Sequence, residues 1–225
     1  MTTHDIAKTE RMEMYLKAVL TLQELSPPAT VSKVADFMGV SAPSASEMLR
    51  RLEHQGYVRG ASEGFDLTPA GQERATTVVR RLRLAERLLT DVLKLELPQV
   101  YDEACKMEHV ISETVEARLD AVLGHPATCP HGLPIPGQAQ ARVTPPAATR
   151  PLSELGPGGA GTVASVPEED RTLLEYLVGQ GLVPGAAVEV EQVAPFNGPL
   201  TLRVGGTTRA IGREVAARVR VRPAA

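Results

Sequence analysis

The chain has 225 residues, of which 43% are hydrophobic and only 3% are aromatic, with no tryptophan. This length accommodates two or three small domains, and the shortage of aromatic side chains argues against binding single-stranded nucleic acid by base stacking. The formal net charge of −3 excludes a uniformly basic nucleic-acid binder. We find no apolar run of about 20 residues and no signal peptide, and therefore expect a cytoplasmic protein without a membrane segment.

The first 124 residues are rich in Leu, Glu and Arg, and their apolar periodicity predicts helices. Ser41 is a good N-cap, and Pro43 suits the first turn of the helix that follows it. Gly60 and Gly64 bound a turn between two short strand-like stretches. The expected elements are helices over 5–25, 31–38 and 41–55, then strands over 57–59 and 65–67. This order is typical of a winged helix-turn-helix over residues 1–75.

The helix that begins after Ser41 would enter the major groove of DNA. Its small and polar side chains can approach base edges, and the nearby arginines can reach phosphates. Helix-turn-helix patterns also occur as plain packing motifs in helical proteins, but the strand pair that follows favours DNA binding. The predicted DNA-contacting residues are Ser41, Pro43, Ser44, Ser46, Glu47, Arg50, Arg51 and Arg59.

The rest of the chain divides into a helical zone and a β-rich zone. Thr68 and Pro69 begin a helix that we expect to reach about Leu95, and further helices are predicted over 99–107 and 110–123. The Pro-, Ala- and Gly-rich stretch from 125 to 151 is interpreted as a linker. Beyond it, short Val-rich runs alternate with Gly and Pro, which predicts a small β-barrel-like module.

Metal-binding side chains occur near the end of the helical zone. Cys105, Glu108 and His109 have the spacing i, i+3, i+4, which places a thiolate, a carboxylate and an imidazole on one helix face. A core cysteine beside a solvated Glu–His pair would give the same spacing, so the pattern alone leaves both interpretations open. Cys105 and Cys129 lie far apart in sequence, which favours free thiols or metal ligands over a disulfide.

Several stretches taken together resemble the diphtheria toxin repressor family. They are EMYLKAV, the winged-helix segment, RLAERLLTDVL, DEACKMEHVISETVEARL and PIPG, with the C-terminal stretches LSELGPGGAG, GLVPGAAVEV and PFNGPLTLRVGG resembling the ferrous-transport A-type module. The resemblance implies a mainly α protein with small β elements. Its implied domains are a winged helix-turn-helix DNA-binding domain over 1–75, a helical dimerisation and metal-binding domain with a Pro-rich linker over 76–150, and an SH3-like β-barrel over 151–225.

The resemblance also implies a function and a site. The expected protein is a cytoplasmic homodimeric repressor, not an enzyme, that binds a palindromic operator in double-stranded DNA and controls metal-homeostasis genes when Mn(II) or Fe(II) is bound. The implied metal ligands are Met14, Cys105, Glu108 and His109. Met14 by itself would be interpreted as a core residue, because methionine fills core gaps more often than it binds metal.

A second metal site of the family departs from its usual form here. Leu82 and Tyr101 stand where the family has histidines, and only Glu86 of that trio is present. We therefore expect that the usual second site does not form. Two roles for Glu86 stay open, a salt bridge with Arg83 or Arg87 and a metal site completed from the third domain. The candidate partners for such a site are Glu168, Glu169 and Asp170.

The loop HPATCPHG offers further soft donors in His125, Cys129 and His131. They could form a separate metal or redox site, but we favour the interpretation that they are incidental residues of a proline-stiffened linker. Two alternative functions stay open at this stage. One is a winged-helix regulator of the same fold that responds to a non-metal signal. The other, less favoured because no acid–base pair or nucleophile lies near the metal-binding residues, is a metalloenzyme.

Overall fold

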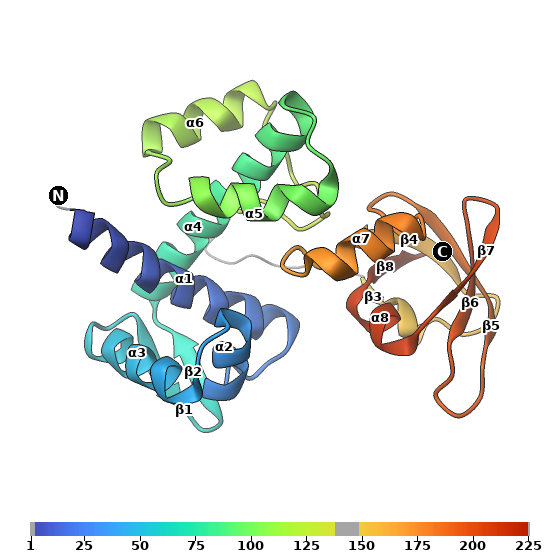
Figure 1. Ribbon diagram of the computed structural model, residues 1–225, viewed down its shortest axis with the longest axis horizontal. Helices are drawn as coiled ribbons and strands as arrows, with labels where there is room; N and C mark the ends of the chain where they lie inside the picture. Colours follow the sequence, from blue (N-terminus) through green and yellow to red (C-terminus); the bar gives the residue numbers. More distant parts are fainter. Residues whose placement is uncertain (1–2, 138–148, 225) are drawn as a thin grey trace. The chain divides into compact units, whose positions relative to one another are not determined.

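The computed structural model describes residues 3–137 and 149–224. Contacts between residues divide the chain into two compact units (Figure 1). The first contains Met1–Leu82 and Glu108–Ile111, and the second contains Arg83–Met107, Ser112–Ile135 and Pro145–Ala225. Across the described residues, we find no helix that is both long and apolar enough to cross a membrane.

The first unit contains the predicted winged helix-turn-helix. Its elements are α1 (Thr3–Leu25), α2 (Val31–Met38), α3 (Ala42–His54) and the antiparallel hairpin β1 (Val58–Ala61) and β2 (Gly64–Leu67). Helix α1 packs on α2, α3 and β2 (Figure 1). Leu16, Leu49 and Leu52 are fully buried in the core that these elements share. The first helix is therefore part of the winged helix-turn-helix fold and not a separate arm.

Local side-chain chemistry sets the boundaries of α2 and α3. The hydroxyl of Thr30 accepts a hydrogen bond from the backbone N–H of Lys33, which caps α2. Gly39 ends that helix in the left-handed region, with φ of +63°, where a side chain would be strained. Ser41 then caps α3 by accepting from the backbone N–H of Ser44. The predicted N-cap is confirmed.

Further helices follow the wing, and the boundary between the two units falls within the first of them, between Leu82 and Arg83. These helices are α4 (Pro69–Arg87), the π-helix η1 (Leu88–Val92), α5 (Leu97–Met107) and α6 (Glu113–Val122). The helix expected to reach Leu95 ends earlier, since the chain turns with a positive φ of 61° at Lys94. The helix expected from Val110 begins only at Glu113, because the Ser112 hydroxyl accepts from the backbone N–H of Val115 and caps it there.

The linker interpretation is wrong for the residues up to 137. Cys129 and Ile135 are buried with Leu84 in a small core of their own. A β-bridge pairs Thr128 with Pro134, so the loop folds back on itself. Residues 138–148 lie outside the described part of the chain. Proline and glycine in this stretch therefore build an ordered loop over 125–137.

The C-terminal part is the expected small β module. Six antiparallel strands lie in the order β3-β8-β4-β5-β6-β7 (Figure 1). Alternate residues of β6, namely Leu200, Leu202 and Val204, are buried with Leu174 and Leu177 of α7. The elements are β3 (Arg150–Pro151), the 3₁₀-helix η2 (Leu152–Glu154), β4 (Ala160–Ser165), α7 (Arg171–Gly179), β5 (Ala187–Val193), β6 (Leu200–Val204), β7 (Thr207–Ile211), α8 (Arg213–Arg218) and β8 (Arg220–Pro223).

Gly71 lies where α4 packs closely against the backbone at the start of the wing. A methyl group at this position would lie 1.9 Å from the carbonyl oxygen of Tyr57, so backbone would have to move. We expect Gly71→Ala to lower the free energy of unfolding by about 1–3 kcal/mol, measured as a lower melting temperature. Gly179→Ala is the control, because nothing lies within 4 Å of its added methyl group. Equal melting temperatures for the two variants would contradict this packing.

Candidate metal centre

A chain of ion pairs joins three segments of the first unit. Lys17 Nζ on α1 lies 2.6 Å from Glu108 Oε1, and His109 Nε2 lies 3.3 Å from the same oxygen. His109 Nδ1 lies 2.8 Å from Glu13 Oε2, again on α1. The Arg74 guanidinium of α4 completes the chain at 3.1 Å from Glu13 Oε1. The predicted ligands Glu108 and His109 are thus placed together and tied to α1.

Burial makes the Lys17–Glu108 pair unusual. The Glu108 side chain has no exposed area, and the Lys17 side chain is only 2% exposed. Glu108 Oε2 is also buried and has no hydrogen-bond partner within residues 3–137 and 149–224. A carboxylate in such surroundings requires a cation close by, since an uncompensated buried charge is strongly destabilising. The carboxylate of Glu108 and the imidazole beside it are donors suited to a divalent transition metal.

The carboxylates around His109 control its charge. Burial opposes protonation of the ring, but hydrogen bonds and charges from Glu108 and Glu13 outweigh it and raise the pKa of His109 to about 9. Burial acts to raise the pKa of Glu13, and the contacts with His109 and Arg74 lower it overall. Glu13 therefore holds Nδ1 and leaves Nε2 turned towards Glu108, as carboxylates next to metal-binding histidines do.

The other two predicted ligands have simpler surroundings. Met14 follows Glu13 on α1 and is half-buried. Cys105 lies on α5, is half-buried and is not part of a disulfide. Their role as ligands stays a prediction. Our sequence reasoning missed Glu13 and Lys17, although their i, i+4 spacing next to Met14 indicated one shared helix face.

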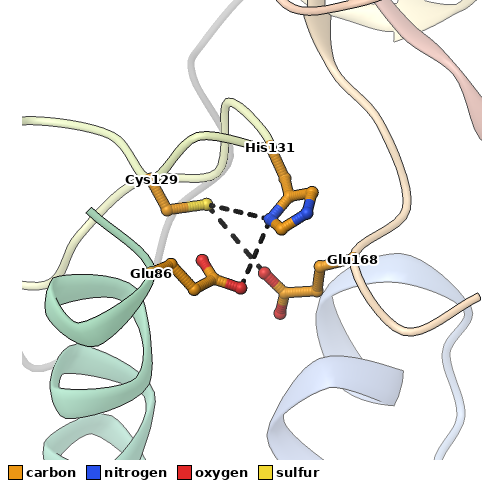
Figure 2. Close-up of side chains that lie close together, drawn as sticks. All are labelled: Glu86, Cys129, His131 and Glu168. Atoms are coloured by element: carbon orange, nitrogen blue, oxygen red, sulfur yellow. Dashed lines mark hydrogen bonds and ion pairs between the residues drawn. The ribbon is translucent and has the colours of Figure 1, made fainter. Parts of the chain in front are cut away.

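A second group of donors lies in the second unit (Figure 2). It consists of Glu86 near the end of α4, Cys129 and His131 in the 125–137 loop, and Glu168 between β4 and α7. One ligand atom from each lies within 4.8 Å of the others, and all four residues are buried. His131 Nδ1 is 3.3 Å from Glu86 Oε1. Cys129 Sγ is 4.0 Å from His131 Nδ1 and 4.0 Å from Glu168 Oε2.

Backbone contacts hold this loop in place. The Arg87 guanidinium of α4 donates to the carbonyl oxygen of Thr128 at 2.6 Å. The backbone N–H of Val166, just after β4, donates to the carbonyl oxygen of His131 at 3.0 Å. Gly132 allows the close approach, because a methyl group there would lie 2.0 Å from the carbonyl oxygen of Ala164. Three segments distant in sequence therefore meet at the four donors.

The donor set fits a metal ion. Both carboxylate oxygens of Glu86 and Nε2 of His131 are buried without a hydrogen-bond partner among the described residues. A tetrahedral ion with bonds of about 2.0–2.3 Å separates its ligand atoms by roughly 3.3–3.8 Å. The observed separations of 3.3 Å and 4.0 Å require little movement to match. Thiolate, imidazole and carboxylate together suit a divalent transition metal better than Mg²⁺ or Ca²⁺.

Three of these donors have a raised pKa. Burial raises the pKa of the Cys129 thiol well above its ordinary value, and the charges of Glu86 and Glu168 raise it further. Burial also raises the pKa of Glu168 to about 7, although the Arg83 guanidinium 3.6 Å away acts in the opposite direction. Burial lowers the pKa of His131, but contact with Glu86 raises it overall. A metal that bound here would displace protons.

The structure brings some of the residues predicted for this region together and separates others. Glu86 and Glu168 lie together, and Glu86 faces His131 while Arg83 pairs with Glu168. Our interpretation of Cys129 as an incidental linker residue is wrong, as it is for His131, because both are buried beside the carboxylates. The remaining residues named in advance have other partners: Glu169 and Asp170 pair with Arg218, Asp170 also caps α7, and the exposed His125 pairs with Asp120.

The predicted DNA-contacting residues lie on α3 and the wing. Ser46 is half-buried and the others are exposed: Ser41, Pro43, Ser44, Glu47, Arg50, Arg51 and Arg59. Arg59 on β1 lies 3.6 Å from Asp66 on β2, an exposed pair that costs little to open. The polar face of α3 is therefore available to the major groove.

Family models match three consecutive parts of the chain. Residues 8–63 match the iron dependent repressor N-terminal DNA binding domain, and residues 68–137 match the iron dependent repressor metal binding and dimerisation domain. Residues 150–223 match the FeoA domain.

Whole-chain comparisons agree with these matches. The chain is 37% identical over 220 residues to the iron-dependent repressor IdeR of Mycobacterium tuberculosis, covering 93% of this chain and 95% of that protein. It is 43% identical over 126 residues to the diphtheria toxin repressor of Corynebacterium diphtheriae, covering 56% of each. A solved manganese-dependent transcriptional repressor in complex with manganese superposes with a TM-score of 0.87 at 34% identity, covering 95% of this chain and 100% of that one.

The raised pKa of His109 predicts how the stability of the metal-free protein depends on pH. The folded state holds this proton up to about pH 9, against an ordinary value of 6.5. The stabilisation is therefore complete below pH 6.5 and is lost as the pH rises through 9. Between pH 7 and 10 the melting temperature should fall more steeply for the wild type than for His109→Gln. Parallel profiles for the two proteins would contradict the assignment.

The four-donor cluster predicts a thiolate-bound metal. Co(II) added to the metal-free protein should give a thiolate-to-metal charge-transfer band in the near ultraviolet, and Cys129→Ser should remove one component of it. Cys105→Ser, at the other candidate site, is the matched control and should leave that component unchanged. Metal uptake at the cluster should release protons, measurable in a weakly buffered solution. A spectrum insensitive to Cys129→Ser would exclude this thiol as a ligand.

Proposed function

Because this chain belongs to the iron-dependent repressor family, we propose that it is a metal-dependent transcriptional repressor in which bound Mn(II) or Fe(II) permits binding to operator DNA. Both IdeR and the diphtheria toxin repressor are repressors, and neither is an enzyme. The proposed role is therefore regulation of metal-homeostasis genes.

The observation that carries this proposal is the double role of α1. This helix packs on α2, α3 and the wing, and it also brings Glu13 and Lys17 to the Glu108–His109 segment. We propose Met14, Cys105, Glu108 and His109 as the residues that hold the regulatory ion. The ion would supply a strong positive charge that ties α1 to this segment. Because α1 is packed on the recognition helix, a change in its position is transmitted to α3.

Glu86, Cys129, His131 and Glu168 are proposed to hold a second ion. Glu168 belongs to the part of the chain that matches the FeoA domain, and the other three belong to the metal binding and dimerisation domain. An ion bound by these four residues would therefore connect the part that matches the FeoA domain to the part that matches the metal binding and dimerisation domain. Glu86 and Glu168 supply hard oxygen donors, and Cys129 and His131 supply softer sulfur and nitrogen, a mixture that both Mn(II) and Fe(II) accept.

The exposed residues of α3 are proposed to read the operator. Ser44 and Glu47 are exposed and would meet base edges, while the exposed Arg50, Arg51 and Arg59 would supply phosphate contacts. A local cluster of this kind is compatible with the formal net charge of −3.

We further propose that the repressor acts as a homodimer in the cytoplasm. Large apolar side chains are exposed on η1 and α6 and in the turn after η1: Val92, Leu93, Val115 and Val122. Surfaces of this kind are typical of subunit contacts. A two-fold dimer presents two recognition helices, which predicts an operator with palindromic half-sites.

Fluorescence anisotropy with DNA from the promoter of its own gene tests the central proposal. Metal-free protein should bind weakly, and Mn(II), or Fe(II) under anaerobic conditions, should tighten binding by at least about tenfold. His109→Gln should lose this response. Full DNA binding in the presence of a chelator would contradict the proposal and favour a regulator that responds to a non-metal signal.

A second pair of variants separates DNA contact from metal binding. Arg50→Ala should weaken DNA binding in saturating metal and reduce the slope of the salt dependence by about 1, if it contacts a phosphate. Arg203→Ala removes an equally exposed arginine from β6 and should leave DNA affinity unchanged. Metal affinity should stay at the wild-type value in both variants. An unchanged salt slope in Arg50→Ala would exclude that phosphate contact.

A further inference from the structure

A buried lysine occupies the cation position at a carboxylate that we assign to the regulatory metal. Lys17 Nζ lies 2.6 Å from Glu108 Oε1, with the lysine side chain 2% exposed and the glutamate side chain fully buried. Burying a lysine is costly, because its strongly hydrated ammonium group loses its water. The position of Lys17 therefore requires a reason beyond packing.

The helix α1 presents this lysine to the same place as the proposed ligands. Lys17 follows Met14 by three residues and Glu13 by four, so the three side chains share one helix face. Glu13 lies 2.8 Å from His109 Nδ1, and Lys17 lies against Glu108. Oε1 of Glu108 faces both the ammonium of Lys17 and His109 Nε2 at 3.3 Å. These two groups surround the oxygen that a metal shared by Glu108 and His109 would use.

We propose that Lys17 is a built-in competitor of the metal. Its ammonium neutralises Glu108 in the metal-free protein and has to move away from Glu108 when the divalent ion binds. The inference rests on the proposed function, since it requires Glu108 and His109 to be metal ligands. A divalent ion bonded to Oε1 would lie within about 4 Å of the ammonium, and two cations at that distance repel strongly in a buried site.

This arrangement has two consequences. The metal-free protein keeps Glu108 compensated, so α1 stays attached to the Glu108–His109 segment before metal arrives. The metal has to replace an existing ion pair, which weakens its apparent affinity. Lys17 therefore raises the metal concentration at which the repressor responds, so that a modest metal supply leaves it inactive.

The test is the metal affinity of Lys17→Met, which removes the charge and keeps an unbranched apolar stem. Titration of Mn(II) against a fluorescent chelator should resolve the binding step that is lost in His109→Gln. At that step the dissociation constant of Lys17→Met should fall by about tenfold or more relative to the wild type. The metal-free variant should melt at a lower temperature than the metal-free wild type, and saturating Mn(II) should remove most of that difference.

Three further variants control the measurement. Lys33→Met removes a lysine of the same unit whose ammonium donates to the backbone of Ser26, and it should leave the dissociation constant unchanged. Lys17→Arg keeps the positive charge and should stay close to the wild type. Lys17→Gln, which retains a hydrogen-bond donor to Glu108, should also bind Mn(II) more tightly than the wild type, and it serves if Lys17→Met does not fold.

The possible results distinguish this inference from the proposed function. An unchanged or larger dissociation constant in Lys17→Gln or Lys17→Met would overturn the competitor role and make Lys17 a partner that stays beside the metal. A wild-type protein without any Mn(II) or Fe(II) binding step sensitive to His109→Gln would overturn the metal assignment itself.

Discussion

Buried carboxylates, and the cations that each of them needs, are the constraint around which this protein is organised. Glu86 and Glu108 have no exposed area, and Glu168 is 7% exposed. A negative charge placed away from water is tolerated only with a proton, a basic side chain or a metal beside it. Each of these carboxylates contacts side chains from other segments of the chain. The need to compensate its buried charge therefore also determines which elements pack together.

The two sites meet this requirement in opposite ways. At Glu108 the ammonium of Lys17 supplies the positive charge within the chain, and one oxygen stays open. At Glu86 the imidazole of His131 lies 3.3 Å from Oε1. Burial and the nearby carboxylates raise the pKa of the Cys129 thiol, and contact with Glu86 raises the pKa of His131. Under our proposals, an ion at the first site would replace an existing ion pair, whereas an ion at the second would displace protons.

At the second site, the candidate metal-binding side chains come from positions other than those that the family resemblance implies. Leu82 and Tyr101 stand where the family resemblance implies histidines, and Leu82 is a fully buried core residue. Cys129 and His131 supply sulfur and nitrogen from a loop instead, next to the retained Glu86. Helix α4 carries Arg74 towards its beginning and Glu86 at its last turn, so one continuous helix contributes to the charge arrangements of both compact units.

The sequence alone determined what depends on local periodicity and spacing, namely the winged helix and the β module. The single helix face expected for Cys105, Glu108 and His109 is not found, because α5 ends at Met107 and the other two residues follow it in a turn. Only the tertiary structure decided which distant residues share a buried site. Cys129 and His131 lie in a stretch whose proline and glycine content is typical of linkers, so nothing local marks their burial. Lys17 likewise has the sequence context of a solvated helix residue, and only the position of Glu108, 91 residues away, makes it part of a site.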